Sequence, residues 1–389
     1  MTALTDDAHQ HLAQPDHLGA LAEMIRKVIE PQAARIDREG VFPHTALRAL
    51  AGAGLGVLLM PRALGGQEAP TAVYAEAVAR ISAACGSTST AYMTQLHCAH
   101  PIHLRGRPEQ QQRWIPALCS ADAIGAIALT ETGAGSDVAS MRTTARRHDD
   151  TYVIHGGKTF ISNGDVADVI VLFATLDPRL GKEGITAFLI ETAQLQGLSA
   201  GTPMKKLGQK GASTVELSFD DCRIPRDALL GEEGQGYPLL LESVTKSRIS
   251  AAAQGLGFAQ GAYDATARLC AEQGLLSSRA RHAQDLQFAL AAIRSEIFSA
   301  RSMLQAVCDL VDTSDVDATI EVSMAKLHCT ALGVRVASTC VELLGEDGDR
   351  LDLGVERRLR DAKIAEIYDG TSQVQSMIIA RDIRLAASR

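Results

Sequence analysis

The spacing of apolar residues along this 389-residue chain changes twice, and these changes limit the folds that it can adopt. Near the start, apolar side chains such as Leu18 and Leu21 recur every three or four residues, as on one face of a helix. After Ser120 short β-rich runs appear, and from Tyr237 the helical spacing returns. The chain is also too long for a single small core. We therefore predict an α+β multidomain protein with a helical N-terminal domain (1–120), a middle β domain (121–231) and a C-terminal helical bundle (232–389).

Five runs in the middle segment are rich in β-branched and aromatic residues, which is typical of strands. They cover residues 124–129, 152–154, 169–175, 185–191 and 215–219. No helical segments alternate with these runs, and no helix of the right length follows the Gly133-Ala134-Gly135 turn. Both observations argue against a doubly wound dinucleotide-binding sheet. We therefore expect a compact β domain between two helical ones.

Helical patterns fill the last part of the chain. They cover residues 239–256, 258–272, 284–311 and 317–344, and two shorter ones follow at 360–367 and 372–384. Long helices joined by short loops pack as an antiparallel bundle. We therefore predict a bundle with two short helices at its end.

The charge balance and the cysteines limit the partners and the compartment. A formal net charge of -8 and the absence of a Lys/Arg-rich run argue against nucleic acid as the main partner. Eight scattered cysteines without a Cys-x-x-Cys pair favour reduced thiols over disulfides or zinc. Residues 1–15 lack the features of a secretion signal, and no run of eighteen apolar residues exists. We expect a cytoplasmic protein without a membrane span.

Three histidines, His97, His100 and His103, recur at every third position and raise the question of a metal site. Pro101 is expected to interrupt the helix that would align them. No carboxylate completes the ligand set. We therefore expect no metal here.

Two polar turns in the middle domain are suited to a ligand. The run Leu129 to Asp137 ends a strand in hydroxyls and glycines, so that Thr130, Ser136 and backbone N–H groups can face a polar or anionic ligand. An ordinary loop is an equally good interpretation. Further on, Phe160 and Ser162 share one strand face, which suits a flat ring with hydrogen-bonding edges. From spacing alone, core packing is the preferred interpretation of Phe160.

A third turn lies between the last two helical patterns. Gly370 permits a backbone turn there, and the Thr371 hydroxyl can cap the helix that follows. Asp369 therefore lies at a break in the helix and is expected to point away from both helices. Taken alone, it is best explained as a solvated acidic residue at a helix junction.

Together these motifs resemble the flavin-dependent acyl-CoA dehydrogenases, and the resemblance covers nearly the whole chain. It rests on residues 129–137, 158–164, 207–211, 219–231 and 360–375, in this order. The family implies an α-helical domain, a β-barrel and a four-helix C-terminal domain. It also implies a homotetramer, or a homodimer, with one FAD per subunit.

The resemblance assigns roles to individual residues. Thr130 would bind the flavin pyrimidine edge, Ser162 would hydrogen-bond near N5, and Phe160 would cover the ring where many members have Trp. The other implied FAD contacts are Ile127, Leu129, Gly135, Ser136, Ile161, Thr371, Gln373 and, from a neighbouring subunit, Gln284. The implied substrate contacts are Ser136, Thr245, Arg248 and Gly370.

The implied reaction is α,β-dehydrogenation of an acyl thioester, carried by CoA or by a carrier protein. A carboxylate removes the α-proton while flavin N5 takes the β-hydride. The family's thioester carbonyl is bound by a ribityl hydroxyl and by the backbone N–H of the base. Asp369 occupies the position of the base, where most relatives have Glu, and Ser247 occupies the alternative position. Burial would raise the pKa of Asp369 and the following helix would lower it, and the sequence leaves the net direction open.

Other departures concern the far half of the FAD site. Gln273 and Leu276 stand where the family usually has Arg and Phe. Glu342 stands in place of a Gln, and Gly345-Glu346 in place of two glycines, so that the second glycine is replaced by an acid. Losing a cation and adding acids beside a diphosphate weakens binding. We therefore expect FAD to be held less tightly than in typical members.

Three functional classes stay open at this point. The first is an acyl-thioester dehydrogenase that uses Asp369 and passes electrons to an electron-transfer flavoprotein or to oxygen. The second is oxidation of another carbon acid, such as a nitroalkane, although Ser376 replaces the Arg of those relatives. The third is a degenerate, non-catalytic subunit of a hetero-oligomer.

Overall fold

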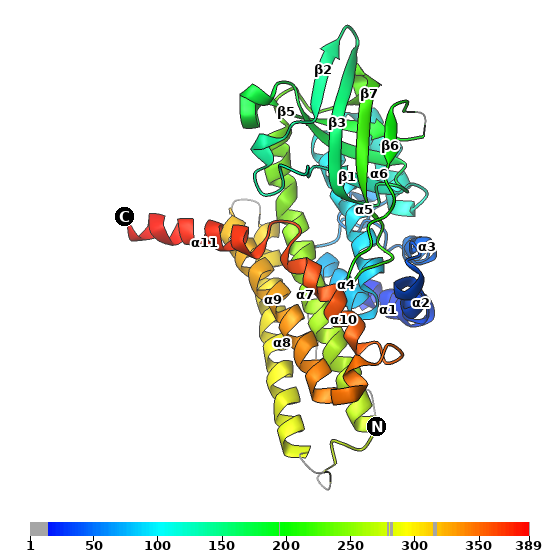
Figure 1. Ribbon diagram of the computed structural model, residues 1–389, viewed down its shortest axis with the longest axis vertical. Helices are drawn as coiled ribbons and strands as arrows, with labels where there is room; N and C mark the ends of the chain where they lie inside the picture. Colours follow the sequence, from blue (N-terminus) through cyan, green and yellow to red (C-terminus); the bar gives the residue numbers. More distant parts are fainter. Residues whose placement is uncertain (1–14, 194, 278–279, 281–282, 314–316, 389) are drawn as a thin grey trace.

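The computed structural model describes residues 15–388 apart from 194, 278, 279, 281, 282 and 314–316 (Figure 1). The predicted absence of a secretion signal concerns residues 1–15, and 1–14 lie outside the described residues. A β domain lies at one end of the molecule, a helical bundle extends from it, and the N-terminal helices lie beside both.

The N-terminal helices are α1 Pro15–Met24, α2 Glu30–Glu39, α3 His44–Gly52, α4 Thr71–Ala84, α5 Gly86–Arg105 and α6 Pro108–Ser120; π-helical η2 Ile25–Ile29 joins α1 to α2, and 3-10 turn η3 Arg62–Leu64 precedes α4. The expectation that Pro101 interrupts a helix is wrong. Pro101 lies inside α5 and is buried, so packing of α5 against α4, α6, α7 and β1 outweighs the lost backbone hydrogen bond.

The β domain is one eight-stranded sheet in the order β6-β7-β3-β2-β4-β5-β8, with β1 beside β4. Its strands are β1 Gly125–Ala128, β2 Thr144–His148, β3 Thr151–Ser162, β4 Val169–Thr175, β5 Ile185–Glu191, β6 Leu198–Ala200, β7 Thr214–Pro225 and β8 Leu229–Leu230, with 3-10 turns η4 Val138–Ser140, η5 Pro178–Gly184 and η6 Arg226–Ala228. Most pairs are antiparallel, whereas β4 pairs in parallel with β1 and β2. The sheet is therefore not doubly wound.

Strand β4 connects the two large cores. Its alternate residues Val169, Val171 and Phe173 belong to the core shared with the helices. Ile170 and Leu172, on the other face, belong to the core of the β domain. Because both faces are covered, the strand is a continuous apolar run.

The C-terminal part contains α7 Gly236–Glu272, α8 Ala283–Asp312, α9 Thr319–Leu344, η7 Gly345–Asp349, α10 Val355–Ala362, η8 Lys363–Glu366 and α11 Ser372–Ala387. The two predicted helices before residue 272 form a single helix, α7. Gly257 does not break it: a Cβ there would lie 2.2 Å from the Ala79 carbonyl oxygen, so the glycine permits close packing of α4.

By length and composition alone, one stretch of the described residues, Thr319–Asp349, could cross a membrane. It consists mainly of α9, which packs against α7, α8, α10 and α11 in the bundle. A core helix passes the same test, and this packing favours that interpretation. The start of α11 packs against α9, whereas its C-terminal part projects away from the bundle (Figure 1).

Candidate active site

A buried ion pair shapes the polar loop that follows β1. The Lys158 side chain is fully buried, and its Nζ donates to Glu131 Oε1 at 2.7 Å and to the Leu129 carbonyl at 2.9 Å. Glu131 also accepts the backbone N–H groups of Arg142 and Thr143, at 2.6 and 3.0 Å. The carboxylate therefore ties both ends of the loop to β3.

Both members of this pair are charged at neutral pH. Burial favours neutral Glu131, but the Lys158 ammonium and the two backbone donors outweigh burial and lower the pKa of Glu131. Burial lowers the pKa of Lys158 to about 8, against the opposing effect of Glu131. A satisfied buried pair of this kind fixes local geometry.

Phe160 lies at an irregular position of β3. Its ring is 66% exposed and its φ is +58°, whereas the following Ile161 is buried. The β3–β7 register shifts between Lys158 and Ile161, and the Thr159 N–H donates to the Thr130 carbonyl at 2.8 Å. The preferred interpretation of Phe160 as a core residue is therefore wrong, because the bulge turns its ring outward beside the polar loop.

The polar loop is open where a ligand could approach. Gly135 and Ser136 are exposed, and an added Cβ at Gly133 would meet no atom within 4 Å. Thr130 and Ser162 are half-buried, as are Ile127 and Leu129. An exposed aromatic ring, free hydroxyls and open backbone are what a planar heterocycle with polar edges requires.

The turn between η8 and α11 has two left-handed residues, Asp369 at φ +52° and Gly370 at φ +88°. The left-handed conformation of Gly370 was expected, because glycine permits it, but that of Asp369 was not. The Thr371 hydroxyl accepts the Val374 N–H at 3.2 Å, which confirms the predicted cap. Figure 1 shows α11 beginning at the end of the bundle that is nearer the β domain.

Asp369 is half-buried rather than solvated, and its Oδ2 is enclosed without a hydrogen-bond partner. Among the described residues, its backbone N–H also has no acceptor. Burial raises the pKa of Asp369 to about 7, against the positive charges of Lys326 and then Arg248. The interpretation of Asp369 as a solvated junction residue is therefore wrong, and burial outweighs the charges that oppose it.

Arg248, on α7, was predicted to lie beside the substrate. It is buried, its Nε has no partner, and the carboxylate of Asp369 opposes the lowering of its pKa by burial. Thr245 is half-buried on the same helix, and Ser247 is buried and donates to the Val244 carbonyl. The structure thus brings Arg248 and Asp369 together.

The sequence analysis missed one basic group of this site, Lys326. Its side chain is fully buried in α9 and its Nζ donates to the Gly370 carbonyl at 2.7 Å. Its position between Val322, Ala325 and Cys329 on the apolar face of a helical pattern is the signal that could have drawn attention to it, because lysine is almost never fully buried without a partner.

Of the remaining predicted contacts, one lies beside this turn and one lies far from it. Gln373 is exposed on the first turn of α11. Gln284 is exposed at the second position of α8, which begins at the end of the bundle farther from the β domain (Figure 1). One subunit therefore does not bring Gln284 to the polar loop, so a role for it requires a second subunit.

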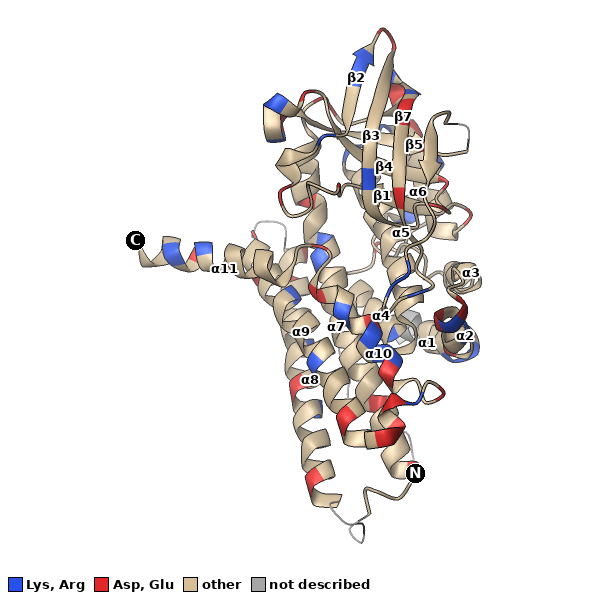
Figure 2. Cartoon of the chain, viewed as in Figure 1, with Lys and Arg blue, Asp and Glu red and all other residues tan. Residues whose placement is uncertain are grey.

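Acidic residues gather at one end of the bundle, in and near η7 (Figure 2). Gln273 donates to Asp347 there at 2.7 Å, and Arg350 pairs with Asp347 and Asp352. The amide and the cation that could meet a diphosphate are thus already engaged by carboxylates of the same chain.

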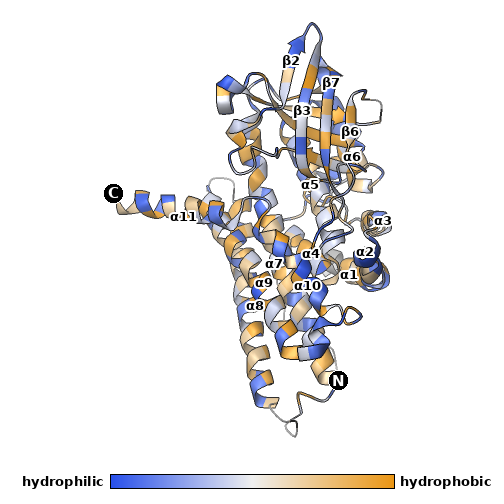
Figure 3. Cartoon of the chain, in the orientation of Figure 1, coloured by the Kyte–Doolittle hydropathy of each residue, from blue (hydrophilic) through white to orange (hydrophobic). Residues whose placement is uncertain are grey.

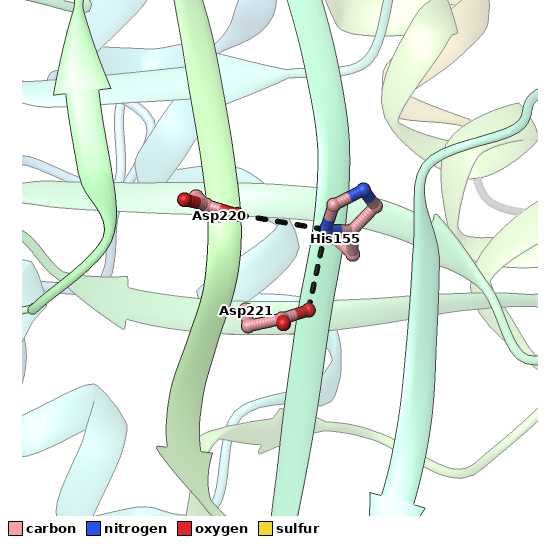
Figure 4. Close-up of side chains that lie close together, drawn as sticks. All are labelled: His155, Asp220 and Asp221. Atoms are coloured by element: carbon pink, nitrogen blue, oxygen red, sulfur yellow. Dashed lines mark ion pairs between the residues drawn. The ribbon is translucent and has the colours of Figure 1, made fainter.

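The described residues contain one cluster able to share a metal ion, formed by His155, Asp220 and Asp221 (Figure 4). All three are exposed on β3 and β7. His97, His100 and His103 do not belong to it, and His97 Nε2 lies 3.2 Å from the Ser250 hydroxyl. All eight cysteines are buried free thiols, as expected from their spacing.

The chain thus combines a helical domain, a β sheet and a helical bundle with an open polar loop beside an exposed aromatic ring and with an enclosed carboxylate. Family models for the N-terminal, middle and C-terminal domains of acyl-CoA dehydrogenase match residues 15–122, 126–222 and 234–384. The chain belongs to the acyl-CoA dehydrogenase family. It is an oxidoreductase that acts on CH–CH groups, with FAD as cofactor.

Among its relatives, cyclohex-1-ene-1-carbonyl-CoA dehydrogenase of Geobacter metallireducens is 34% identical over 377 residues, which cover 96% of this chain and 98% of that protein. The structure of butyryl-CoA dehydrogenase from Megasphaera elsdenii superposes with a TM-score of 0.88 at 28% identity, covering 95% of this chain and 97% of the other. The crystal structure of the prolyl acyl carrier protein oxidase AnaB superposes with a TM-score of 0.87 at 27% identity, covering 95% of this chain and 99% of the other.

The described residues fit FAD on the flavin side. The outward Phe160 ring and the open loop at Gly133 to Ser136 offer a stacking face and polar donors. The buried Glu131–Lys158 pair ties this loop to β3.

Proposed function

We propose that this protein dehydrogenates an acyl thioester between Cα and Cβ, with Asp369 as the base that removes the α-proton. The observation that supports this most strongly is the combination at Asp369 of an enclosed, unpartnered Oδ2 and a pKa raised by burial to about 7. A carboxylate that is both desolvated and uncommitted is suited to general-base catalysis near neutral pH.

The chain's own groups account for substrate positioning. The backbone N–H of Asp369, which has no acceptor among the described residues, would donate to the thioester carbonyl and so stabilise the negative charge that develops there. Arg248 would bind on the same side, and Phe160, Thr130 and Ser162 would hold the flavin, with Thr371 and Gln373 as further FAD contacts. When bound, FAD supplies the acceptor for the β-hydride.

Asp369 is one methylene shorter than the Glu that most relatives have, which reduces its reach by about 1.5 Å, while proton transfer requires heavy atoms within roughly 3 Å. We infer that the substrate's α-carbon lies closer to the turn than in those relatives. Acyl-CoA is the leading substrate class. Similarity to a carrier-protein oxidase supports acyl-carrier protein as the second.

The test uses the FAD-loaded protein without oxygen, mixed with saturated acyl-CoAs and acyl-carrier proteins of several chain lengths. Loss of flavin absorbance with a thioester, abolished by Asp369→Asn, supports the proposal. Bleaching only by a carbon acid that is not a thioester, such as a nitroalkane, would contradict the proposal and indicate oxidation of that other carbon acid. Failure of the correctly folded oligomer to bind FAD would support the degenerate subunit.

We propose that FAD is held less tightly than is usual in the family. Gln273 is engaged by Asp347, and Glu346 adds a negative charge in η7, where a diphosphate would suffer repulsion. Dialysis of the loaded protein followed by an absorbance spectrum tests this: a large loss of FAD supports weak binding, and stoichiometric retention contradicts it.

We also propose a cytoplasmic homotetramer or homodimer that passes electrons to an electron-transfer flavoprotein or to oxygen. The projecting α11 carries apolar residues along its length (Figure 3), and Met377, Ile383 and, on α8, Phe288 are 71%, 62% and 64% exposed. Such surfaces are typical of interfaces. Light scattering that gives a monomer mass would contradict the assembly.

A further inference from the structure

The turn that carries Asp369 is held from two helices. Lys326, in α9, donates from Nζ to the Gly370 carbonyl at 2.7 Å. Gln375, buried in α11, donates from Nε2 to the same oxygen at 2.9 Å. An added Cβ at Gly370 would lie 2.4 Å from Gln375 Nε2, which shows how closely this turn is packed.

The turn needs such contacts because its backbone conformation is unfavourable. Asp369 has φ +52°, a left-handed conformation that residues with a side chain seldom adopt. Without bonds to the Gly370 carbonyl, the peptide could relax, and the carboxylate would then turn away from its present direction. The position of the carboxylate thus depends on the two donors.

Lys326 also differs from the other buried lysine, Lys158. Lys158 forms an ion pair with Glu131 at 2.7 Å, whereas no carboxylate of the described residues forms an ion pair with Lys326. Burial lowers the pKa of Lys326 to about 8, and the nearby Asp369 opposes this effect. Burying an ammonium group costs free energy when its only hydrogen bond is to a carbonyl. This cost indicates that the positive charge of Lys326 has a role in the site.

The groups that face Asp369 come from several helices. Lys326 on α9 and Arg248 on α7 are the positive groups, and both favour the ionised carboxylate. Tyr74 on α4 and the neighbouring Tyr368 also lie near it, and burial keeps both phenols neutral by raising their pKa. Glu366 acts on Lys326. Of the two cations, only Lys326 also bonds to the turn.

We propose that Lys326 is a positioning residue for the base: it fixes the Asp369 carboxylate through the Gly370 carbonyl, and its ammonium group favours the ionised form of that carboxylate. This inference rests on the proposed role of Asp369. It predicts that loss of the ammonium group weakens the reaction mainly at low pH, where the base is more easily protonated.

The test compares the rate of flavin reduction by a saturated acyl thioester between pH 6 and 9 in FAD-loaded variants. Lys326→Met removes both the bond and the charge, and Lys326→Arg keeps a cationic donor. Lys326→Gln is a second charge-removing variant that serves if Lys326→Met does not fold. Lys27→Met, which breaks an exposed pair with Glu23, is the control.

We expect Lys326→Met or Lys326→Gln to slow flavin reduction about tenfold at pH 6 and by less at pH 9. The reason is that a rise of one unit in the pKa of Asp369 lowers its ionised fraction about tenfold at pH values below that pKa. Lys326→Arg should restore much of the rate, and Lys27→Met should behave as the native protein. An unchanged pH profile would overturn the inference. So would an equal loss at every pH accompanied by loss of FAD.

Failure of this inference can be separated from failure of the proposed function. If Asp369→Asn is inactive but the Lys326 variants keep the native pH profile, the base stands and the role of Lys326 is wrong. If Asp369→Asn still bleaches the flavin at the native rate, the proposed base is wrong and the role of Lys326 is overturned with it.

Discussion

Glu131 and Asp369 are both carboxylates in tight turns, but their surroundings are opposite. Glu131 is buried against Lys158 and accepts two backbone N–H groups, and its pKa is lowered. Asp369 has an enclosed oxygen with no partner, and its pKa is raised to about 7. Burial favours the neutral form of both side chains, so the number of nearby hydrogen-bond donors decides whether the pKa is raised or lowered.

The difference separates a group that builds the site from one that is available for chemistry. A carboxylate that accepts several hydrogen bonds stabilises a loop and does not easily take a proton. A carboxylate that lacks donors is less stable as an anion and therefore a stronger base. Replacing each side chain should accordingly affect different properties.

The largest expected effect is on catalysis at Asp369. Asp369→Asn should lower kcat by ~10³-fold or more, since general-base catalysis contributes on the order of 10²–10⁴-fold. The melting temperature at pH 8 should not fall: burial raises the pKa of Asp369 to about 7, so its ionised form destabilises the fold at pH 8, and the neutral amide removes that effect. Steady-state assays with a dye acceptor and calorimetry measure the two effects. Lower stability with retained kcat would reverse our assignment.

The next effect concerns stability at the paired carboxylate. Lys158→Met should lower the free energy of unfolding by about 3 kcal/mol, because removing one partner leaves a buried charge uncompensated. Urea unfolding of the FAD-free protein measures it. Lys27→Met, at an exposed pair with Glu23, is the control and should change stability by less than about 1 kcal/mol. If Lys158→Met and Lys27→Met lowered the free energy of unfolding equally, the buried pair would be no more important for stability than the exposed pair.

The pH dependence of the reaction should follow Asp369 and not Glu131. The base must be ionised, so kcat/KM should fall about tenfold per pH unit below the raised pKa of about 7. Glu131 stays ionised across that range because its pKa is lowered. Initial rates between pH 5 and 9, corrected for FAD content, measure this. A rate that is constant down to pH 5 would contradict the raised pKa.

The smallest effect is expected at the exposed ring of Phe160. Phe160→Ala should weaken FAD binding by about 1 kcal/mol, the order of an aromatic stacking contact, and should leave the melting temperature of the FAD-free protein unchanged. Fluorescence titration measures the affinity. Leu180→Ala, at another exposed apolar residue, is the control. Equal FAD affinity in both variants would remove the stacking role.

The helical, β and helical parts of the fold could be predicted because long stretches keep one apolar period. Strands 169–175 and 185–191 were predicted with their observed ends, since continuous apolar runs mark them. Strand β2 was missed because it is mostly polar and exposed. Strands β6 and β8 were missed because three and two residues are too few to show an alternation of apolar and polar side chains. Pro101 shows tertiary packing outweighing local preference.

For the candidate site, local sequence indicated the turn at Gly370 and the cap at Thr371, and the family resemblance pointed to Asp369. The Glu131–Lys158 pair was not foreseen because the two residues are 27 positions apart in the chain. Lys326 likewise meets Gly370 across 44 positions. Such contacts arise only when distant elements pack, and they determine the pKa values that the sequence left open.

Exchange of the substrate's α-proton tests the central claim most directly, because it reports proton removal at Asp369 separately from hydride transfer. The FAD-loaded protein and a saturated acyl thioester would be incubated without oxygen in deuterated buffer, and NMR would follow the α-position. We predict deuterium uptake that increases with pH through about 7 and is lost in Asp369→Asn. Equal uptake in Asp369→Asn and the native protein would contradict the account.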